Sequence, residues 1–95
     1  MVIYFVYMKE KEYEKILKAF ANHRRLQIVI YIKNKKSATV GVLSGHIKLS
    51  FKSTSKHLAV LYGAGILDRE QKDLSMFYSL SSSMSKFARH IVSFV

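Results

Sequence analysis

The sequence predicts a mainly α-helical fold with a small β-hairpin, its elements in the order α-α-α-α-β-β-α. Apolar residues recur at helical spacing over residues 10–64 and 84–95, and they alternate with polar residues in two short segments between residues 66 and 80. The chain has no Pro and only four Gly, as suits helices joined by few sharp turns. With 95 residues, 49% of them hydrophobic, it is expected to form one domain spanning residues 1–95.

The first helix is expected over residues 10–21, behind an apolar arm of eight residues. The arm is far shorter than the ~20 apolar residues that span a bilayer, and it lacks the basic leader and cleavage site of a secretory signal. We therefore expect a strand or a helix packed on the domain or on a partner chain, in a cytoplasmic protein without a membrane partner. The apolar residues of the helix itself are spaced 3, 1 and 3 apart: Tyr13, Ile16, Leu17 and Phe20.

Two further helices are expected before residue 48. Asn22 can cap the second helix with its side-chain oxygen, and this helix is apolar nearly all round, so it should be buried. The polar run 33–37 ends it. Either Ser37 or Thr39 is expected to cap a short third helix.

The fourth helix has two clearly different faces. Ser50 is expected to cap it, and it should run to about Ala64. Gly63 and Gly65 stop it, one of them in the left-handed conformation. Helical spacing points Thr54, Leu58 and Leu61 inward, and it points Lys52, Lys56 and Ala59 outward with Ser53 and Ser55 beside them.

The pattern then changes to two strands and a last helix. Residues 66–69 and 76–80 read as strands joined by the polar turn 70–75. A final helix is expected after the serines at 81–83, with a wide apolar stripe. The residues of that stripe are Met84, Phe87, Ala88, Ile91, Phe94 and Val95.

The charge distribution points to a polyanionic partner. The chain carries 16 basic and 6 acidic residues, a net charge of +10. Between Lys15 and Leu67 there are ten basic residues and no acidic one, so this segment accounts for the whole excess. Such a stretch favours a nucleic-acid-binding face over a merely solvated surface.

Two short helices followed by a basic-faced helix and a β-hairpin are typical of the winged helix-turn-helix. In that fold the basic-faced helix enters the major groove of DNA, where its outward side chains reach base edges and phosphates. The hairpin, or wing, can reach a neighbouring phosphate or the minor groove.

Three segments of the chain carry motifs of a known family. Residues 21–29, ANHRRLQIV, are similar to A-D-P-x-R-L-x-I-L, and residues 77–80, FYSL, are similar to Y-Y-x-L. Residues 49–58, LSFKSTSKHL, followed by Leu61 and Gly65, resemble L-S-x-x-x-V-S-x-H-L-x-x-L-x-x-A-G-L. These are motifs of the second helix, the returning wing strand and the recognition helix of the ArsR-type winged-helix transcriptional regulators. The resemblance covers about residues 12–80, and the piece S-x-H-L-x-x-L-x-x-x-G is its most specific part.

The resemblance implies a homodimer that represses transcription by binding an operator, and that a signal releases. The dimer interface would be formed by residues 1–21 and 82–95. Metal-sensing members place a Cys-x-Cys pair on the third helix, or His and Asp ligands on the last helix. This chain has no Cys, it reads TVGV at 39–42 where the pair would lie, and its last helix has a lone His90. We therefore expect no metal or other cofactor, and any inducer is unknown.

The candidate DNA contacts lie on the helix 50–64 and on the wing 68–76. Lys52 and Lys56 are the best placed for phosphate or guanine, whereas Phe51 is expected either to stack on a thymine methyl or to fold under the helix. His57 is expected either to touch DNA or to pack beside Leu58, and Arg25 either to touch DNA or to be structural. The acidic residues Glu70 and Asp73 lower the positive electrostatic potential of the wing. The full set of candidates is Ser50, Phe51, Lys52, Ser53, Ser55, Lys56, His57, Arg69, Gln71 and Lys72.

Catalysis is not expected. Ser44-Gly45-His46 lacks the pattern of a nucleophile elbow, and Gly63-Ala64-Gly65 follows a helix where a dinucleotide fingerprint would follow a strand. The leading interpretation is a sequence-specific regulator that binds double-stranded DNA. The alternatives are a nonspecific nucleoid or RNA-binding protein, and a winged helix used for protein contact.

Overall fold

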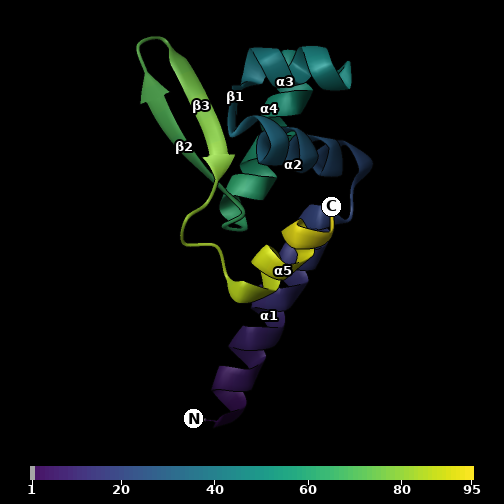
Figure 1. Cartoon of the computed structure of the whole chain (residues 1–95). Coiled ribbons are helices and arrows are strands. Elements are labelled where there is room, and N and C mark those ends of the chain that lie inside the picture. The colour runs from purple at the N-terminus through teal and green to yellow at the C-terminus, as the bar shows by residue number, and fades with distance from the viewer. Residues whose placement is uncertain (1) are drawn as a thin grey trace.

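The computed structural model describes the backbone of residues 2–95 and the side chains of residues 9–95. Its helices and hairpin follow the predicted order, and Figure 1 shows the hairpin and the free end of the first helix at opposite ends of the molecule. The elements are α1 (Val2–Phe20), α2 (His23–Lys35), β1 (Ser37–Thr39), α3 (Val40–Ile47), α4 (Phe51–Gly63), β2 (Leu67–Lys72), β3 (Ser75–Leu80) and α5 (Lys86–Phe94).

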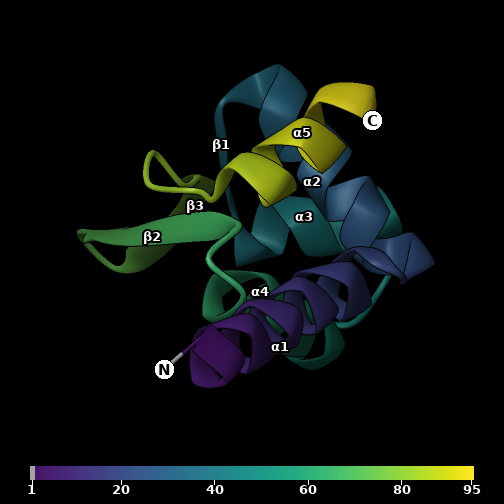
Figure 2. The same cartoon turned by 90° about the horizontal axis from the view of Figure 1, so that it is seen from below.

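Helix α1 is longer than predicted, because the apolar arm continues it back to Val2. No Gly or Pro separates the arm from residue 10, so nothing in the sequence stops the helix there. Seen from below in Figure 2, α1 and α5 both lie in front of α2 and α3, with α1 along one edge of the molecule and α5 along the other. The ring of Tyr13 on α1 nevertheless lies 4.8 Å from that of Phe87 on α5, so the two helices meet through aromatic side chains.

Helix α2 begins as predicted, since the side chain of Asn22 accepts a hydrogen bond from the amide of Arg25. As predicted, α2 is buried, through Ile28, Val29 and Ile32, but only one face packs on the core and Ile30 is 40% exposed. At its other end, the ammonium of Lys33 donates to the backbone carbonyls of Val92 and Val95, at 2.9 and 3.0 Å. These two bonds hold the end of α5 on α2.

Strand β1 was not expected from the sequence. Its three residues pair antiparallel with β3, Ser37 opposite Ser79 and Thr39 opposite Phe77, in a sheet of order β1-β3-β2. A three-residue segment carries too little alternation to be recognised, and its partner lies about forty residues further along the chain. Thr39 then caps α3 by accepting from the amide of Val42.

The hairpin is longer and its turn tighter than predicted. Strand β2 runs to Lys72 and β3 starts at Ser75, so the expected six-residue turn 70–75 contains only Asp73 and Leu74. Both faces of the outer hairpin are exposed to solvent, so charged residues pair there without a burial cost. Gly65, which precedes β2, takes the left-handed conformation expected of one of the glycines, at φ +75°.

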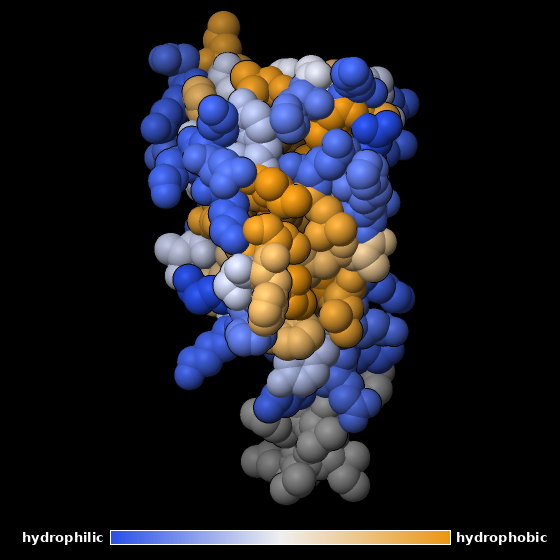
Figure 3. All heavy atoms as spheres, turned by 45° about the vertical axis from the view of Figure 1, so that its right-hand side comes forward, coloured by the Kyte–Doolittle hydropathy of each residue, from blue (hydrophilic) through white to orange (hydrophobic). Residues whose placement is uncertain are grey.

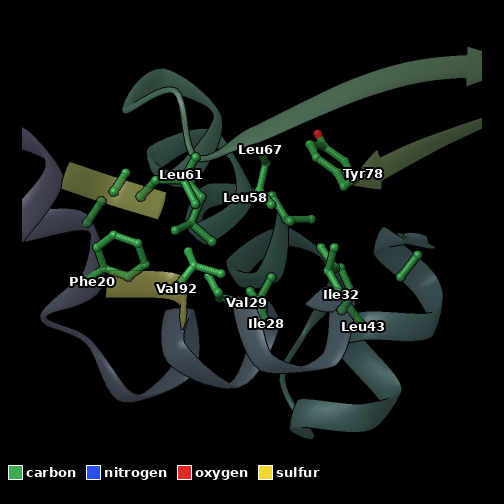
Figure 4. Packing of buried hydrophobic residues seen from close by; sticks show 14 of the residues in the cluster. Phe20, Ile28, Val29, Ile32, Leu43, Leu58, Leu61, Leu67, Tyr78 and Val92 are labelled. Atoms are coloured by element: carbon green, nitrogen blue, oxygen red, sulfur yellow. The ribbon is translucent and has the colours of Figure 1, made fainter. Parts of the chain in front are cut away.

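One core joins all five helices to the base of the hairpin. In Figure 4, Phe20 and Val92 lie at one end of the cluster, whereas Ile32, Leu43 and Tyr78 lie at the other. Helix α5 starts later than expected, capped by Ser85, because Met84 is buried in the segment before the helix. This packing fixes α4 and the hairpin relative to each other.

Candidate nucleic-acid interface

Helix α4 has the two faces that the sequence predicted. Thr54, Leu58 and Leu61 are fully buried, whereas Lys52 and Lys56 are exposed. Ser53 and Ser55 are half-buried along the edges of the exposed face. An inward face this well packed holds the outward lysines at fixed positions relative to the rest of the domain.

Ser50 closes the start of α4 by accepting hydrogen bonds with both its side chain and its carbonyl. Its side-chain oxygen accepts from the amide of Ser53 at 3.1 Å, which confirms the predicted cap. Its carbonyl accepts from the buried hydroxyl of Thr54 at 2.8 Å, so this polar side chain has a partner in the core. Ser50 therefore has a structural role, whether or not it also touches DNA.

Arg25 connects three helices with its guanidinium group. Nε donates to the carbonyl of Ala19 at 2.7 Å, and Nη2 donates to that of Lys18 at 3.0 Å, both at the end of α1. Nη1 lies 3.1 Å from Nδ1 of His57 on α4. Each of the three nitrogens thus has a partner within the protein, which supports the structural alternative for Arg25.

His57 uses one ring nitrogen to accept from Arg25, so this nitrogen is not available to DNA. Burial, and then the positive charges of Arg25 and Arg24, lower the pKa of His57 below its ordinary value of 6.5. The imidazole is therefore neutral at pH 7, as an acceptor at Nδ1 must be. Arg24 itself donates to the carbonyl of Ile47 at the end of α3, so α2 fixes both helices of the helix-turn-helix.

The two basic residues of the wing, Arg69 and Lys72, each contact another side chain of the protein. The guanidinium of Arg69 lies over the ring of Tyr62 on α4, 4.0 Å from the centroid, and its pKa is raised, mainly by a hydrogen bond with Tyr78. The ammonium of Lys72 lies 3.5 Å from a carboxylate oxygen of Glu70. Gln71, between them in sequence, is exposed. Arg69 therefore lies at the base of the wing, and the charge of Lys72 is partly compensated.

A groove of about 370 Å³ lies between the tip of the wing, the start of α3 and the first residue of α4. It is lined by Phe51 at the start of α4, by residues 39–41 at the start of α3, and by residues 74–76 at the end of the wing. Phe51 is 62% exposed, so it does not fold under the helix. Leu74 is 99% exposed, and its place among the polar residues of the turn gave no sign of a site in the sequence.

A second surface, the α1/α5 face, is apolar. It comprises Leu17, 51% exposed, Phe94, 78% exposed, and the less exposed Tyr13, Phe87 and Ile91. Figure 3 shows apolar side chains gathered at mid-height, next to the described part of α1 and flanked by hydrophilic ones. Exposed apolar areas of this kind are typical of protein–protein contacts.

Among the described residues, no group of three or more His, Asp or Glu side chains is arranged to hold a metal ion. None of the described helices is long and apolar enough to cross a membrane.

Comparison with known proteins gives consistent results. Residues 22–69 match the model of a family described as "Bacterial regulatory protein, arsR family". The transcriptional activator HlyU of Vibrio cholerae is 39% identical over 71 residues, 75% of this chain and 65% of the relative, so the chain spans just under two thirds of that relative's length. The structure of HlyU from Vibrio cholerae matches with a TM-score of 0.78 and 31% identity over 90% of this chain and 89% of that one. The structure of the transcriptional repressor PagR of Bacillus anthracis matches with a TM-score of 0.76 and 26% identity, over 93% of this chain and 97% of that one.

Proposed function

The chain belongs to the arsR family of bacterial regulatory proteins, which are regulators of transcription and not enzymes, and we propose that it acts as a dimer that binds specific sequences of double-stranded DNA. Helix α4 enters the major groove, and the wing, residues 68–76, contacts the backbone beside it. The observation that carries this proposal is α4 itself, with a fully buried inner face and with Lys52 and Lys56 exposed on its outer face.

The electrostatics of this face support DNA over a neutral partner. No acidic residue lies between Lys15 and Leu67, and none of the ion pairs among the described residues involves α3 or α4. The lysines of α4 can therefore replace counterions on phosphates without first breaking a bond within the protein. Lys56, with Ser53 and Ser55 on either side of it, is the residue we assign to base edges, and Lys52 to phosphate.

Arg25 and His57 belong to this proposal as positioning residues. They join α4 to the end of α1 through the 3.1 Å contact between Nη1 and Nδ1. In the wing, exposed Gln71 is better placed for the backbone than Arg69, which lies over Tyr62. The domain spans residues 1–95, with no cofactor required.

The dimer is proposed to form through residues 1–21 and 82–95. The exposed Leu17 and Phe94 of the α1/α5 face would be covered there. In such a dimer the two copies of α4 would read two half-sites of a palindromic operator, one helical turn of DNA apart or a multiple of it.

The direction of regulation remains a prediction. Repression is what the resemblance implied, but HlyU is described as an activator and PagR as a repressor. A reporter gene behind the operator distinguishes the two, because deletion of a repressor raises expression and deletion of an activator lowers it.

The proposal is tested by removing the two lysines together, Lys52→Ala with Lys56→Ala. We expect the affinity for a preferred duplex to fall about 100-fold, and the salt slope to fall by about one for each lysine that contacts phosphate. The melting temperature should not change, since both side chains are exposed. The control is Lys35→Ala with Lys36→Ala, which removes the same charge from exposed positions at the end of α2, outside α4, the wing and the proposed dimer segments.

Three outcomes contradict the proposal. Undiminished binding by the double variant excludes α4 as the reading helix. An equal loss in the control means that net charge alone drives binding. Wild-type protein that binds every duplex equally is a nonspecific nucleic-acid-binding protein.

A further inference from the structure

The tip of the wing carries a fully exposed leucine. Asp73 takes the left-handed conformation, at φ +56°, so the chain reverses within two residues and Leu74 forms the tip. Its side chain is 99% exposed and therefore contributes almost nothing to the core. Phe51, which is 62% exposed, lines the same groove as Leu74, so two exposed apolar side chains lie together and stabilise little in the free protein, which points to a partner that covers them.

The position of Leu74 relative to α4 indicates which partner. Leu74 and Phe51 line the same groove, and in Figure 1 the tip of the hairpin lies at the same end of the molecule as α3. A duplex that receives α4 in its major groove would lie beside this tip, since Phe51 at the start of α4 and Leu74 line one groove. Lys52, next to Phe51, and the net charge of +10 match an anionic partner.

We propose that Leu74 enters the minor groove of the bound duplex and acts as an apolar wedge that selects deformable base steps. The inference rests on the proposed function and extends it to a residue that determines specificity. The walls of the minor groove are formed by deoxyribose, and apolar side chains inserted there part the base steps that unstack most easily, TA and CA/TG. Leu74 carries no charge and no hydrogen-bonding group, so it reads deformability and not a donor–acceptor pattern.

The groove between Phe51 and the wing seats the sugar–phosphate strand that separates the two DNA grooves. Phe51 and Met76 offer apolar surface to the sugars. Val40 and Gly41 at the start of α3 line the same groove, and the positive end of a helix dipole there favours a phosphate. The same strand would then be held by polar atoms of α3 and flanked by apolar atoms of the wing.

The test compares Leu74→Gln, which keeps the size and removes the apolar character, with Leu74→Met, which keeps both. Each variant is titrated against a duplex selected from a random pool, and against the same duplex with its TA or CA step under the wing tip replaced by GC. We expect Leu74→Gln to bind the selected duplex about 10-fold more weakly and to lose the preference between the two duplexes. Leu74→Met should stay within about 2-fold of wild type.

Folding does not confound this test, because a 99% exposed side chain can be replaced without changing the melting temperature. The salt slope should also be unchanged, as no charge is altered. If Leu74→Gln binds and discriminates like wild type, the leucine does not enter the groove and this inference fails, while the proposed function stands. If wild-type protein prefers no duplex, the proposed function itself fails.

Discussion

Replacing Arg25 with Met should destabilise the protein without removing a DNA contact. Its guanidinium makes three hydrogen bonds, to the carbonyls of Ala19 and Lys18 and to His57, and Met keeps only the apolar part of the side chain. A hydrogen bond from a charged group contributes about 1.5–3 kcal/mol when buried. Arg25 is half-exposed, so we take about 1 kcal/mol for each bond and expect a loss of about 2–3 kcal/mol.

The assay is thermal unfolding at fixed protein concentration, because the stability of a dimer depends on it. For a domain of this size, 2–3 kcal/mol corresponds to a fall of about 10–20 °C in melting temperature. The matched control is Lys35→Met, which removes an exposed positive charge from the same helix and should leave the melting temperature unchanged. DNA titrations are made well below both melting temperatures, where the variant should keep the wild-type salt slope.

The result that refutes this reasoning is a variant with wild-type stability and a salt slope lower by about one. Arg25 would then be a phosphate contact, and its three bonds within the protein would contribute no stability. A variant that is both unstable and less salt-dependent would assign Arg25 both roles.

Two further predictions concern pH and assembly. Because the pKa of His57 is lowered in the folded state, the unfolded chain takes up the proton first as the pH falls, so the stability from this group is complete above about pH 6.5 and declines below it. Between pH 7.5 and 5.5 the melting temperature of wild type should fall further than that of His57→Gln. Equal falls would show that the Arg25–His57 contact does not contribute to the pH dependence of stability. Leu17→Glu places a charge on the α1/α5 face at a half-exposed position, so the protein should stay folded but become monomeric by light scattering. A folded dimer of this variant would place the interface elsewhere.

The part of the fold that local patterns determine was predictable from the sequence. The caps at Asn22 and Ser50 were identifiable, and Thr39 was one of two candidates for the third helix, because a side chain that closes a helix lies within three residues of the amide that it binds. The inward face of α4 followed from helical spacing alone. Strand β1 did not, because its existence depends on pairing with β3, far along the chain.

In the candidate site, too, local patterns predict some features, whereas others depend on contacts between distant residues. The exposure of Lys52 and Lys56 follows from their spacing against the buried residues of α4, so the sequence predicted it. The contact of Arg25 with His57 joins residues 32 positions apart, and no local pattern indicates it. Leu74 escaped notice for another reason, because an isolated leucine in a polar turn becomes informative only when the turn is known to be two residues long and its tip exposed.

Selection from a randomised pool of duplex DNA, followed by titration of the winner and of its scrambled version at several salt concentrations, tests the central claim most directly. A sequence-specific regulator is predicted to prefer the winner by about 1000-fold or more, with a steep salt slope for both duplexes. Equal affinity for the two duplexes would contradict sequence-specific binding. Absence of binding to either at moderate salt would leave the winged helix as a surface for protein contact.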